Sequence, residues 1–360
     1  MRETYRETDA SSLERHLALR ARVQAWLATA VPGSARDPRW EARLLELWAH
    51  QAALSPALAA LGEGRVIGAV GDLPCVPVSL FKELRWGVLG PAHTPVVFRT
   101  SGTTGQRRGE VQLLDTAVYD TGSARHARAM LGVLPPRTLS LCPPGGADSS
   151  LGHMVDHLSA RVEHRWRDDQ LLPGTWDRLA ELAAAGPVWL AATAFALDRL
   201  LQEPGAVVLG PESRVMVTGG FKGRVVRLDA ASLYQALPGR LGAPRVVAEY
   251  GMTELSSQLW SELVEAGELP GAFRAPPWLY VYAADPVSGE ALPDGQEGVL
   301  RFLDLANVDS VVGIETMDLG RVWPGADGDR VELRGRLEGA EARGCSLRAE
   351  EALLTLRTSG

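Results

Sequence analysis

The chain has 360 residues, of which 46% are apolar and 22% are charged, and its formal net charge is −7. This length suits one large domain or two moderate ones, and the acidic balance argues against a nucleic-acid partner. No stretch approaches the roughly 20 apolar residues of a membrane span, and the polar start "MRETYRETDASSLERH" lacks the apolar segment of a secretory signal.

The first 60 or so residues are expected to be helical. Apolar residues recur at broadly helical spacing in "SSLERHLALRARVQAWLATA", residues 11–30. A second helix is expected to follow, with Asp37 as its cap and Pro38 at its first position. Trp40 and Leu44 then begin an apolar face that favours packing over chemistry.

From about residue 90, short apolar runs alternate with helical stretches, which predicts an α/β fold with a largely parallel sheet. Ligands of such sheets lie beyond the carboxyl ends of the strands, where this chain places its polar residues. The expected strands are "TPVVFRT", "RTLSLC", "GPVWLAA", "SRVMVTGG" and "PRVVAEYG", with helices at "TWDRLAELAAAG" and "AFALDRLLQE".

The rest of the chain has a different pattern. Residues 265–335 contain strand-like runs broken by turn signals such as Pro-Asp-Gly at 293–295, which predicts an antiparallel meander or a small distorted barrel. A final helix is expected from about residue 347. The predicted organisation is an N-terminal helical region (1–90), an α/β core (91–264), a β-rich subdomain (265–335) and a short C-terminal segment (336–360).

Residues 98–111, "FRTSGTTGQRRGEV", form a loop rich in Thr, Ser and Gly. Gly102 and Gly105 allow close backbone approach, and the hydroxyl and N–H groups of such a loop can surround phosphate oxygens. Arg107 and Arg108 add positive charge. The Walker pattern GxxxxGK[ST] is absent, and such a loop on its own is more often a plain surface turn.

Further motifs follow this loop in a fixed order. They are "VTGGFKG" (217–223), "EYGMTELSSQ" (249–258), "ETMDLG" (315–320) and "GRLEGAEARGCSL" (335–347). Each motif is weak alone, but the ordered combination resembles the adenylate-forming enzymes over residues 95 to 347. Within that superfamily the details are most similar to the LuxE-type acyl-protein synthetases of bacterial bioluminescence, with phenylacetate–CoA ligase as a more distant relative.

The resemblance implies the large domain of an adenylate-forming enzyme, with mainly parallel sheets, flanking helices and a small β meander or barrel. Only some two dozen residues follow Arg336, so the usual C-terminal swinging domain and its lysine are expected to be missing.

The resemblance also implies ATP and Mg²⁺ as cofactors. The β- and γ-phosphates would bind to Thr100, Ser101, Gly102, Thr103, Thr104 and Gly105. Arg108 stands where many relatives have lysine, and Thr253 would lie near the α-phosphate. Glu254 would hold Mg²⁺ with the help of a loop threonine, since hard oxygen ligands suit that ion.

The remaining nucleotide contacts follow from the same resemblance. Gly219, Gly220 and Tyr250 would line the adenine slot, and Asp318 would accept hydrogen bonds from the ribose hydroxyls. Arg336 would lie near the ribose at the position of the hinge.

The acyl-protein synthetases use a cysteine near the C-terminus as acyl acceptor, which implies this role for Cys345. Cys345 precedes a predicted helix and lies near Arg343, and both features favour the thiolate. Alternatively, Cys345 is a small buried apolar residue. Cys75 and Cys142 are expected in the core. The three cysteines have no CxxC spacing, so neither a disulfide framework nor a zinc site is expected, and the cytoplasm is the default compartment.

His153 could line the acyl or adenylate pocket, although a packing role is as consistent with its sequence context. His157 follows at i+4, but no third ligand beyond Asp156 is implied, so a metal site is not expected.

The sequence therefore predicts an ATP-dependent ligase that converts a fatty or similar carboxylic acid into an acyl-AMP. The acyl group would pass to a protein thiol for delivery to an acyl reductase. Residues expected nearest the chemistry are Cys345, Thr253, Arg108 and Arg336. Two alternatives remain open, an acyl- or aryl-CoA ligase and a non-catalytic nucleotide-binding scaffold.

Overall fold

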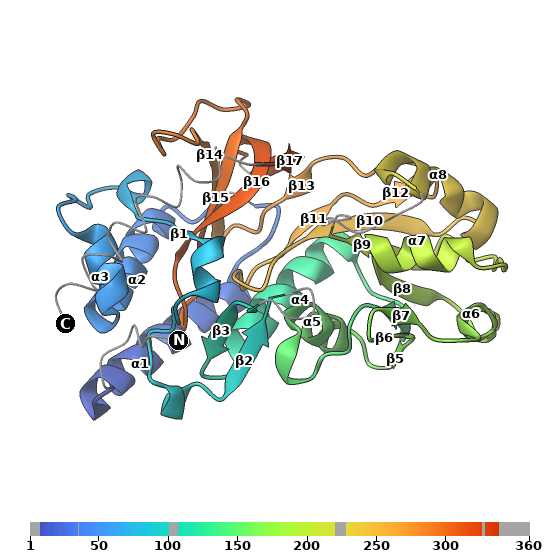
Figure 1. The fold of residues 1–360 in the computed structure, drawn as a ribbon, viewed down its shortest axis with the longest axis horizontal. Coiled ribbons are helices and arrows are strands. Elements are labelled where there is room, and N and C mark those ends of the chain that lie inside the picture. The colour runs from blue at the N-terminus through green and yellow to red at the C-terminus, as the bar shows by residue number, and fades with distance from the viewer. Residues whose placement is uncertain (1–7, 35, 101–106, 220–227, 326–327, 338–360) are drawn as a thin grey trace. The chain divides into compact units, whose positions relative to one another are not determined.

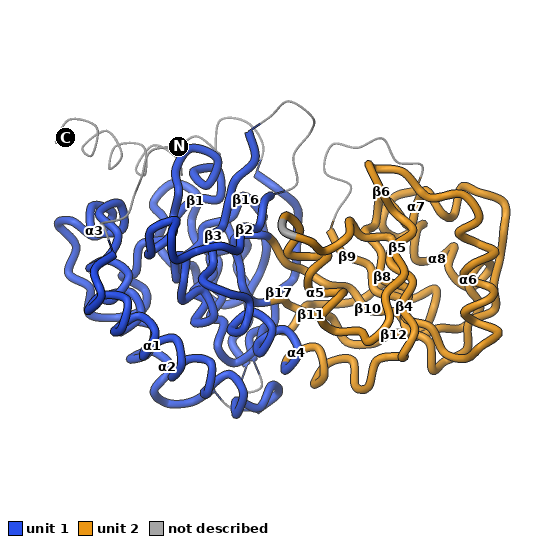
Figure 2. Tube along the Cα trace, turned by 90° about the horizontal axis from the view of Figure 1, so that it is seen from below, with its two compact units in different colours: residues 1–125, 253–257, 275–360 blue, residues 126–252, 258–274 orange. Residues whose placement is uncertain are grey.

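The computed structural model describes residues 8–34, 36–100, 107–219, 228–325 and 328–337. Its contacts divide the chain into two compact units, which Figure 2 colours separately. Unit 1 consists of residues 1–125, 253–257 and 275–360, and unit 2 of residues 126–252 and 258–274. Among the described residues, no helix combines the length and the hydropathy that a membrane crossing requires.

Three helices begin unit 1, as the apolar spacing predicts. They are α1 (Ala10–Thr29), α2 (Trp40–Leu54) and α3 (Pro56–Gly62). The Asp9 carboxylate accepts the N–H of Ser12 at 2.6 Å and caps α1, an interaction that typically stabilises a helix by about 1 kcal/mol.

The start of α2 differs from the prediction. The helix begins at Trp40, and the Asp37 carboxylate accepts the N–H of Arg39 at 2.8 Å in the turn before it. The N–H of Trp40 donates to the Asp37 carbonyl at 2.9 Å. Asp37 therefore shapes the approach to the helix, because its carboxylate accepts a backbone N–H two residues ahead rather than one of the first helical turn.

An antiparallel sheet of unit 1 confirms the predicted meander. Its strands β14 (Leu279–Ala284), β15 (Gly298–Asp304), β16 (Gly313–Trp323) and β17 (Arg330–Arg336) pair in chain order. Short strand β1 (Val76–Pro77) runs parallel to β16. The Pro-Asp-Gly turn lies between β14 and β15, and its glycine has φ 74°, a value that suits a residue without Cβ.

Unit 1 also contains a hairpin that the sequence analysis placed elsewhere. Strands β2 (Val96–Arg99) and β3 (Glu110–Leu113) form a separate antiparallel pair with Phe98 opposite Val111. The run "TPVVFRT" is a strand, but not a strand of the parallel sheet. The chain returns within ten residues, which is too short for the crossover that parallel neighbours need.

The sheet of unit 2 is mainly parallel, which confirms the predicted fold class. Parallel neighbours follow the order β5-β4-β8-β9-β10. Short antiparallel strands extend it beside β10. The strands are β4 (Arg137–Leu141), β5 (Val162–His164), β8 (Val188–Thr193), β9 (Arg214–Thr218), β10 (Arg245–Tyr250), β11 (Leu259–Ser261), β12 (Val264–Glu265) and β13 (Phe273–Arg274).

Helices flank this sheet. The two predicted helices are present as α6 (Thr175–Ala184) and α7 (Ala194–Gln202), and α7 lies beside β8 and β9 (Figure 1). The Thr193 hydroxyl accepts the N–H of Ala196 at 3.1 Å, so the chain passes from β8 into α7 through a capped turn. The further helices are α5 (Ser150–Leu158) and α8 (Ala230–Leu241), and α4 (Ala117–Leu131) contains the boundary between the units at 125/126.

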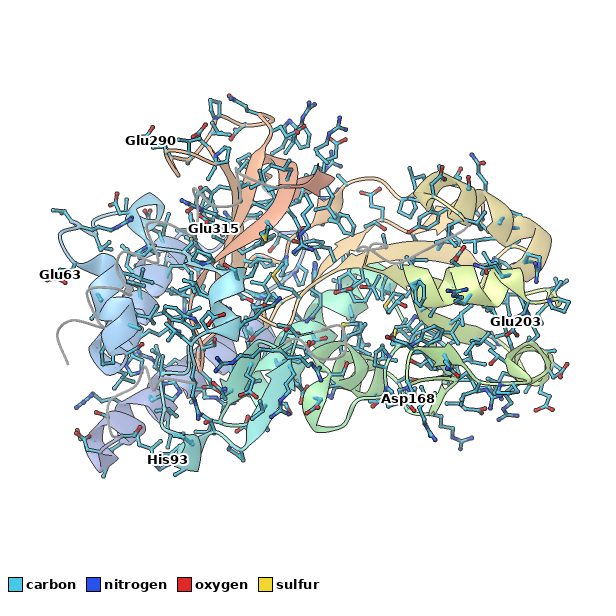
Figure 3. All side chains as sticks on the ribbon, viewed as in Figure 1. Glu63, His93, Asp168, Glu203, Glu290 and Glu315 are labelled. Carbon is cyan, nitrogen blue, oxygen red and sulfur yellow. The ribbon has the colours of Figure 1, made fainter. Side chains whose placement is uncertain are left out.

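A small hairpin completes unit 2. Strands β6 (Trp166–Arg167) and β7 (Gln170–Leu171) are joined by two residues with positive φ, Asp168 at 51° and Asp169 at 58°. Two left-handed residues are typical of the type I′ turn that matches strand twist. Figure 3 labels Asp168 at this turn.

Candidate functional site

The two ends of the predicted phosphate loop are joined by hydrogen bonds at the end of the β2–β3 hairpin in unit 1. The Thr100 N–H donates to the Gly109 carbonyl at 2.9 Å, and the Gly109 N–H donates to the Thr100 hydroxyl at the same distance. The described part of the loop is thus fixed at its two ends. Ser101, Gly102, Thr103, Thr104 and Gly105 lie outside the described residues.

Arg108 binds the backbone at this hairpin end. Its Nε donates to the Thr100 carbonyl at 2.6 Å, and one terminal nitrogen donates to the Arg99 carbonyl at 3.1 Å. Hydrogen bonds from a guanidinium are charge-assisted, and its planar fork suits two neighbouring acceptors. Arg108 therefore connects the strand before the loop to the residues after it.

The segment 253–257 meets the same hairpin. The Thr253 hydroxyl donates to the Arg99 carbonyl at 3.4 Å, so this carbonyl accepts from both Thr253 and Arg108. Glu254 follows in a turn, and its side chain is buried. Unit 1 thus brings together Thr100, Arg108, Thr253 and Glu254, which the sequence separates by about 150 residues.

Asp318 and Arg336 form a second pair within unit 1. They are opposite each other in the β16–β17 register, with 3.8 Å between Asp318 Oδ1 and Arg336 Nε. The Asp318 N–H donates to the Thr316 hydroxyl at 3.0 Å, which holds the backbone of this strand. A bulge follows between Leu319 and Gly320, and bulges often redirect side chains beside active sites.

Unit 2 contains the residues predicted for the adenine slot. Gly219 follows β9 with φ 68°, a left-handed conformation that favours glycine. Tyr250 ends the neighbouring strand β10, and its ring centroid lies 6.0 Å from that of Phe273. Both residues lie at carboxyl ends of parallel strands, as the fold rule requires. Gly220 lies outside the described residues.

Sequence reasoning missed a buried polar pair at the same strand ends. The Thr218 hydroxyl donates to the Glu249 carboxylate, and the two residues are directly opposite in the β9–β10 register. Glu249 is only 5% exposed. A Cβ at Gly251 would lie 2.5 Å from Glu249 Oε1, so a larger residue there would require the Glu249 carboxylate to shift. An acidic residue inside the apolar run "RVVAEYG" was the available signal.

The two described cysteines are poor nucleophiles at neutral pH. Burial raises the pKa of the Cys142 thiol to about 12, and nearby Glu249 adds to this effect. Burial also raises the pKa of Cys75, whose sulfur lies 3.6 Å from the Tyr282 hydroxyl. The thiolate is the reactive form, so neither residue suits acyl acceptance. Cys345 lies outside the described residues.

The two histidines of α5 stack on each other, with ring centroids 6.3 Å apart between His153 and His157. The Asp156 carboxylate instead accepts a hydrogen bond from His164, at 2.8 Å between Oδ1 and Nε2. Within the described ranges, no group of three or more His, Cys, Asp or Glu side chains could hold a metal ion.

We compared the sequence and the structure of the chain with those of known proteins. No protein-family model matches the sequence. The chain is 22% identical over 324 residues to the long-chain-fatty-acid–luciferin-component ligase of Vibrio harveyi, with 83% of each chain covered. Its structure is similar to that of a 2-hydroxyisobutyryl-CoA ligase in the postadenylation state, with a TM-score of 0.54 and 16% identity. This similarity shows that the chain shares the fold of the adenylate-forming enzymes.

The share of each chain that is covered differs between the similar solved structures. The match to 2-hydroxyisobutyryl-CoA ligase covers 92% of this chain and 69% of that one. ATP-bound MatB of Rhodopseudomonas palustris gives a TM-score of 0.48 at 19% identity, over 69% of this chain. The match spans about half of the MatB chain, 49%.

Proposed function

We propose that this protein is an ATP-dependent acyl-protein synthetase that activates a fatty or related carboxylic acid. The observation that carries this proposal is the similarity to the long-chain-fatty-acid–luciferin-component ligase, which extends over 83% of both chains. The positions of the residues expected to bind the nucleotide also support this proposal. Within unit 1 they lie at the end of the β2–β3 hairpin and opposite each other on β16 and β17, and within unit 2 they lie at the ends of β9 and β10.

The proposed reaction has two steps. A carboxylate oxygen of the acid attacks the α-phosphorus of ATP, the bond to pyrophosphate breaks, and acyl-AMP forms. A thiolate then attacks the acyl carbonyl carbon, and AMP leaves with the electron pair of the broken acyl–oxygen bond. The protein mainly positions the anions and stabilises charge on the phosphates.

Each ATP contact is assigned to residues of this chain. Residues 100–105 would surround the β- and γ-phosphates, and Thr253 would lie near the α-phosphate. Arg108 would keep the loop ends together while adding positive charge. Asp318 and Arg336 would contact the ribose, and Gly219, Gly220 and Tyr250 the adenine.

The residues present also fit Mg²⁺. This ion is usually held by one or two carboxylates plus substrate phosphates rather than by a cage of protein ligands. Buried Glu254 supplies such a carboxylate, and Thr253 precedes it in the sequence. Bound Mg²⁺ would supply charge neutralisation on the phosphates, and Glu254 would hold it.

We propose Cys345 as the acyl acceptor and an acyl reductase as the partner that receives the acyl group, in the cytoplasm. The high thiol pKa values of Cys75 and Cys142 support this assignment, because both would remain protonated at neutral pH.

Acid-dependent exchange of labelled pyrophosphate into ATP tests the first step. We expect exchange with Mg²⁺ and a fatty acid from a panel of chain lengths. Its absence with every acid in a broad panel would favour a non-catalytic scaffold.

Peptide mapping after incubation with ATP, Mg²⁺ and labelled acid tests the second step. We expect a hydroxylamine-labile acyl group on the Cys345 peptide and none in Cys345→Ala, with exchange retained in that variant. Thioester formation on added CoA by Cys345→Ala would instead identify a CoA ligase.

A further inference from the structure

The segment 253–257 is held by a part of unit 1 that is distant in sequence. The chain on both sides of these five residues belongs to unit 2. The segment carries Thr253 and Glu254, to which the proposed function gives the α-phosphate and the metal ion. Contacts that fix this segment therefore determine where the Glu254 carboxylate lies.

Asn307 makes the most extensive of these contacts. Its Oδ1 accepts the N–H of Ser256 at 2.7 Å, and its Nδ2 donates to the carbonyls of Glu254 and Val311, both at 2.9 Å. The side chain is 1% exposed. The amide oxygen and both amide hydrogens are thus used, so the side chain has no alternative rotamer that keeps its bonds.

A second set of contacts fixes the end of the segment. The Ser257 hydroxyl donates to Asp304 Oδ1 at 2.8 Å and accepts the indole N–H of Trp278 at 3.0 Å. All three side chains are buried. Breaking a buried hydrogen bond leaves a polar group with no hydrogen-bond partner from water or protein. Because this has a large free-energy cost, the arrangement is rigid.

The loop that carries Asn307 is itself anchored on the N-terminal helices. Gln51 of α2 donates to the carbonyl of Asn307 at 2.7 Å and accepts the N–H of Val312 at 2.8 Å. Asp309 accepts from Arg20 of α1 at 3.1 Å and from the N–H of Leu114 at 3.0 Å. Gln51 supports the loop through bonds that lie outside residues 253–257, which makes it a matched control for Asn307.

We infer that Asn307 is a positioning residue that fixes the backbone on both sides of Leu255 so that the Glu254 carboxylate is preorganised for the metal–nucleotide complex. The inference rests on the proposed function, since it takes Glu254 as the metal-holding residue. Residues that orient a ligand of a metal typically change metal affinity by about 10- to 100-fold when they are removed.

The test compares Asn307→Ala with Gln51→Ala in the full-length protein. Calorimetry measures the Kd of ATP with Mg²⁺ and with EDTA, in the absence of any acid so that no adenylate forms. We expect Asn307→Ala to raise the Kd with Mg²⁺ at least about tenfold and to leave the Kd in EDTA unchanged. Gln51→Ala should leave both values within about threefold of the wild type, since the bonds that it removes, to Asn307 and Val312, lie outside the segment 253–257.

Hydrogen exchange gives a readout that is independent of ATP. The Ser256 amide should exchange faster in Asn307→Ala, and the Val312 amide should exchange faster in Gln51→Ala, because each variant loses the acceptor of that amide. If Asn307→Ala does not fold, Asn307→Asp replaces it, since Asp keeps the volume and the acceptor for Ser256 but loses the donor to Glu254.

The outcomes separate the two claims. If the wild type shows neither pyrophosphate exchange nor a Mg²⁺-dependent ATP affinity, the proposed function is wrong and the inference fails with it. If the wild type shows both, an unchanged Mg²⁺-dependent Kd in the Asn307 variant, or an equal change in Gln51→Ala, overturns the inference alone.

Discussion

Asp318 and Arg336 lie directly opposite each other on β16 and β17, with their charged atoms 3.8 Å apart. The Asp318 side chain is 21% exposed and the Arg336 side chain 46% exposed. Ion pairs this exposed contribute little to folding stability. Variants of either residue should therefore fold normally, so that a loss of activity can be attributed to the nucleotide contact.

Asp318→Ala should raise the KM for ATP in pyrophosphate exchange by roughly 10- to 100-fold, the usual effect of losing hydrogen bonds to a charged group. The thermal midpoint should stay within the error of the wild type. Arg334→Ala is the control, because Arg334 lies on the same strand and pairs with Glu332 at 2.9 Å. Equal ATP kinetics for Asp318→Ala and the wild type would exclude Asp318 from the ribose contact.

Arg108→Lys should weaken ATP binding although it keeps the charge. Lysine lacks the planar fork that donates to both the Thr100 and the Arg99 carbonyls, so the loop ends lose one of these bonds. We expect the KM for ATP to rise by about tenfold. Exposed Arg107 provides the control Arg107→Ala, with little expected change. A fully active Arg108→Lys would show that only the charge at this position matters.

Glu254→Gln should raise the Mg²⁺ concentration that gives half-maximal exchange by roughly tenfold or more, because the neutral amide is a weaker ligand for a hard cation. The measurement is a Mg²⁺ titration at saturating ATP. Glu262→Gln serves as a charge-matched control, since Glu262 is exposed and pairs with Arg274 at 2.9 Å. Identical titrations for both variants would contradict the metal role of Glu254.

Asp304→Asn should change the pH dependence of stability. Burial raises the pKa of the Asp304 carboxyl from 3.8 to about 6, so the folded state binds more protons than the unfolded state between about pH 4 and 6. The contribution of protonated Asp304 to the free energy of unfolding is therefore fully present below pH 4. It is lost as the pH rises through 6, and the loss is roughly 3 kcal/mol. Thermal midpoints of the two proteins across pH 4 to 7 should show this decline only in the wild type. Parallel curves would mean that Asp304 titrates normally.

His50→Gln should change the pH dependence in the opposite direction. Burial, together with the neighbouring His16, lowers the pKa of His50 to about 4, so the unfolded state binds more protons between about pH 4 and 6.5. Stability contributed by neutral His50 is present above pH 6.5 and is lost as pH falls towards 4. Chemical unfolding at pH 7 and pH 5 should show a smaller loss for His50→Gln than for the wild type. An equal loss would rule out His50 as a source of the acid sensitivity.

The sequence predicted the parallel sheet of unit 2 and the antiparallel meander well, because their strands are apolar runs bounded by turn residues. It misplaced "TPVVFRT", since an apolar run does not tell whether the next strand returns in a hairpin or through a helix. The Thr218–Glu249 bond was missed because it depends on the register of two strands. The ordered motifs predicted Thr253 and Glu254, but not Asn307, whose contacts cross some 50 residues of sequence.

The placement of residues 253–257 in unit 1 has a consequence for how the protein is made. The chain passes between the units at 125/126, 252/253, 257/258 and 274/275. Each unit is therefore completed only after part of the other unit has been synthesised. The segment Thr253–Ser257 cannot make its hydrogen bonds to Asn307 until that residue has been synthesised. The same holds for helices α1 and α2, whose His16 and Gln51 bond to this loop. Contacts this distant in sequence slow folding and leave apolar surface uncovered during synthesis. Nascent chains that stop before residue 307 should therefore depend on chaperones, and no contiguous fragment should reproduce unit 1.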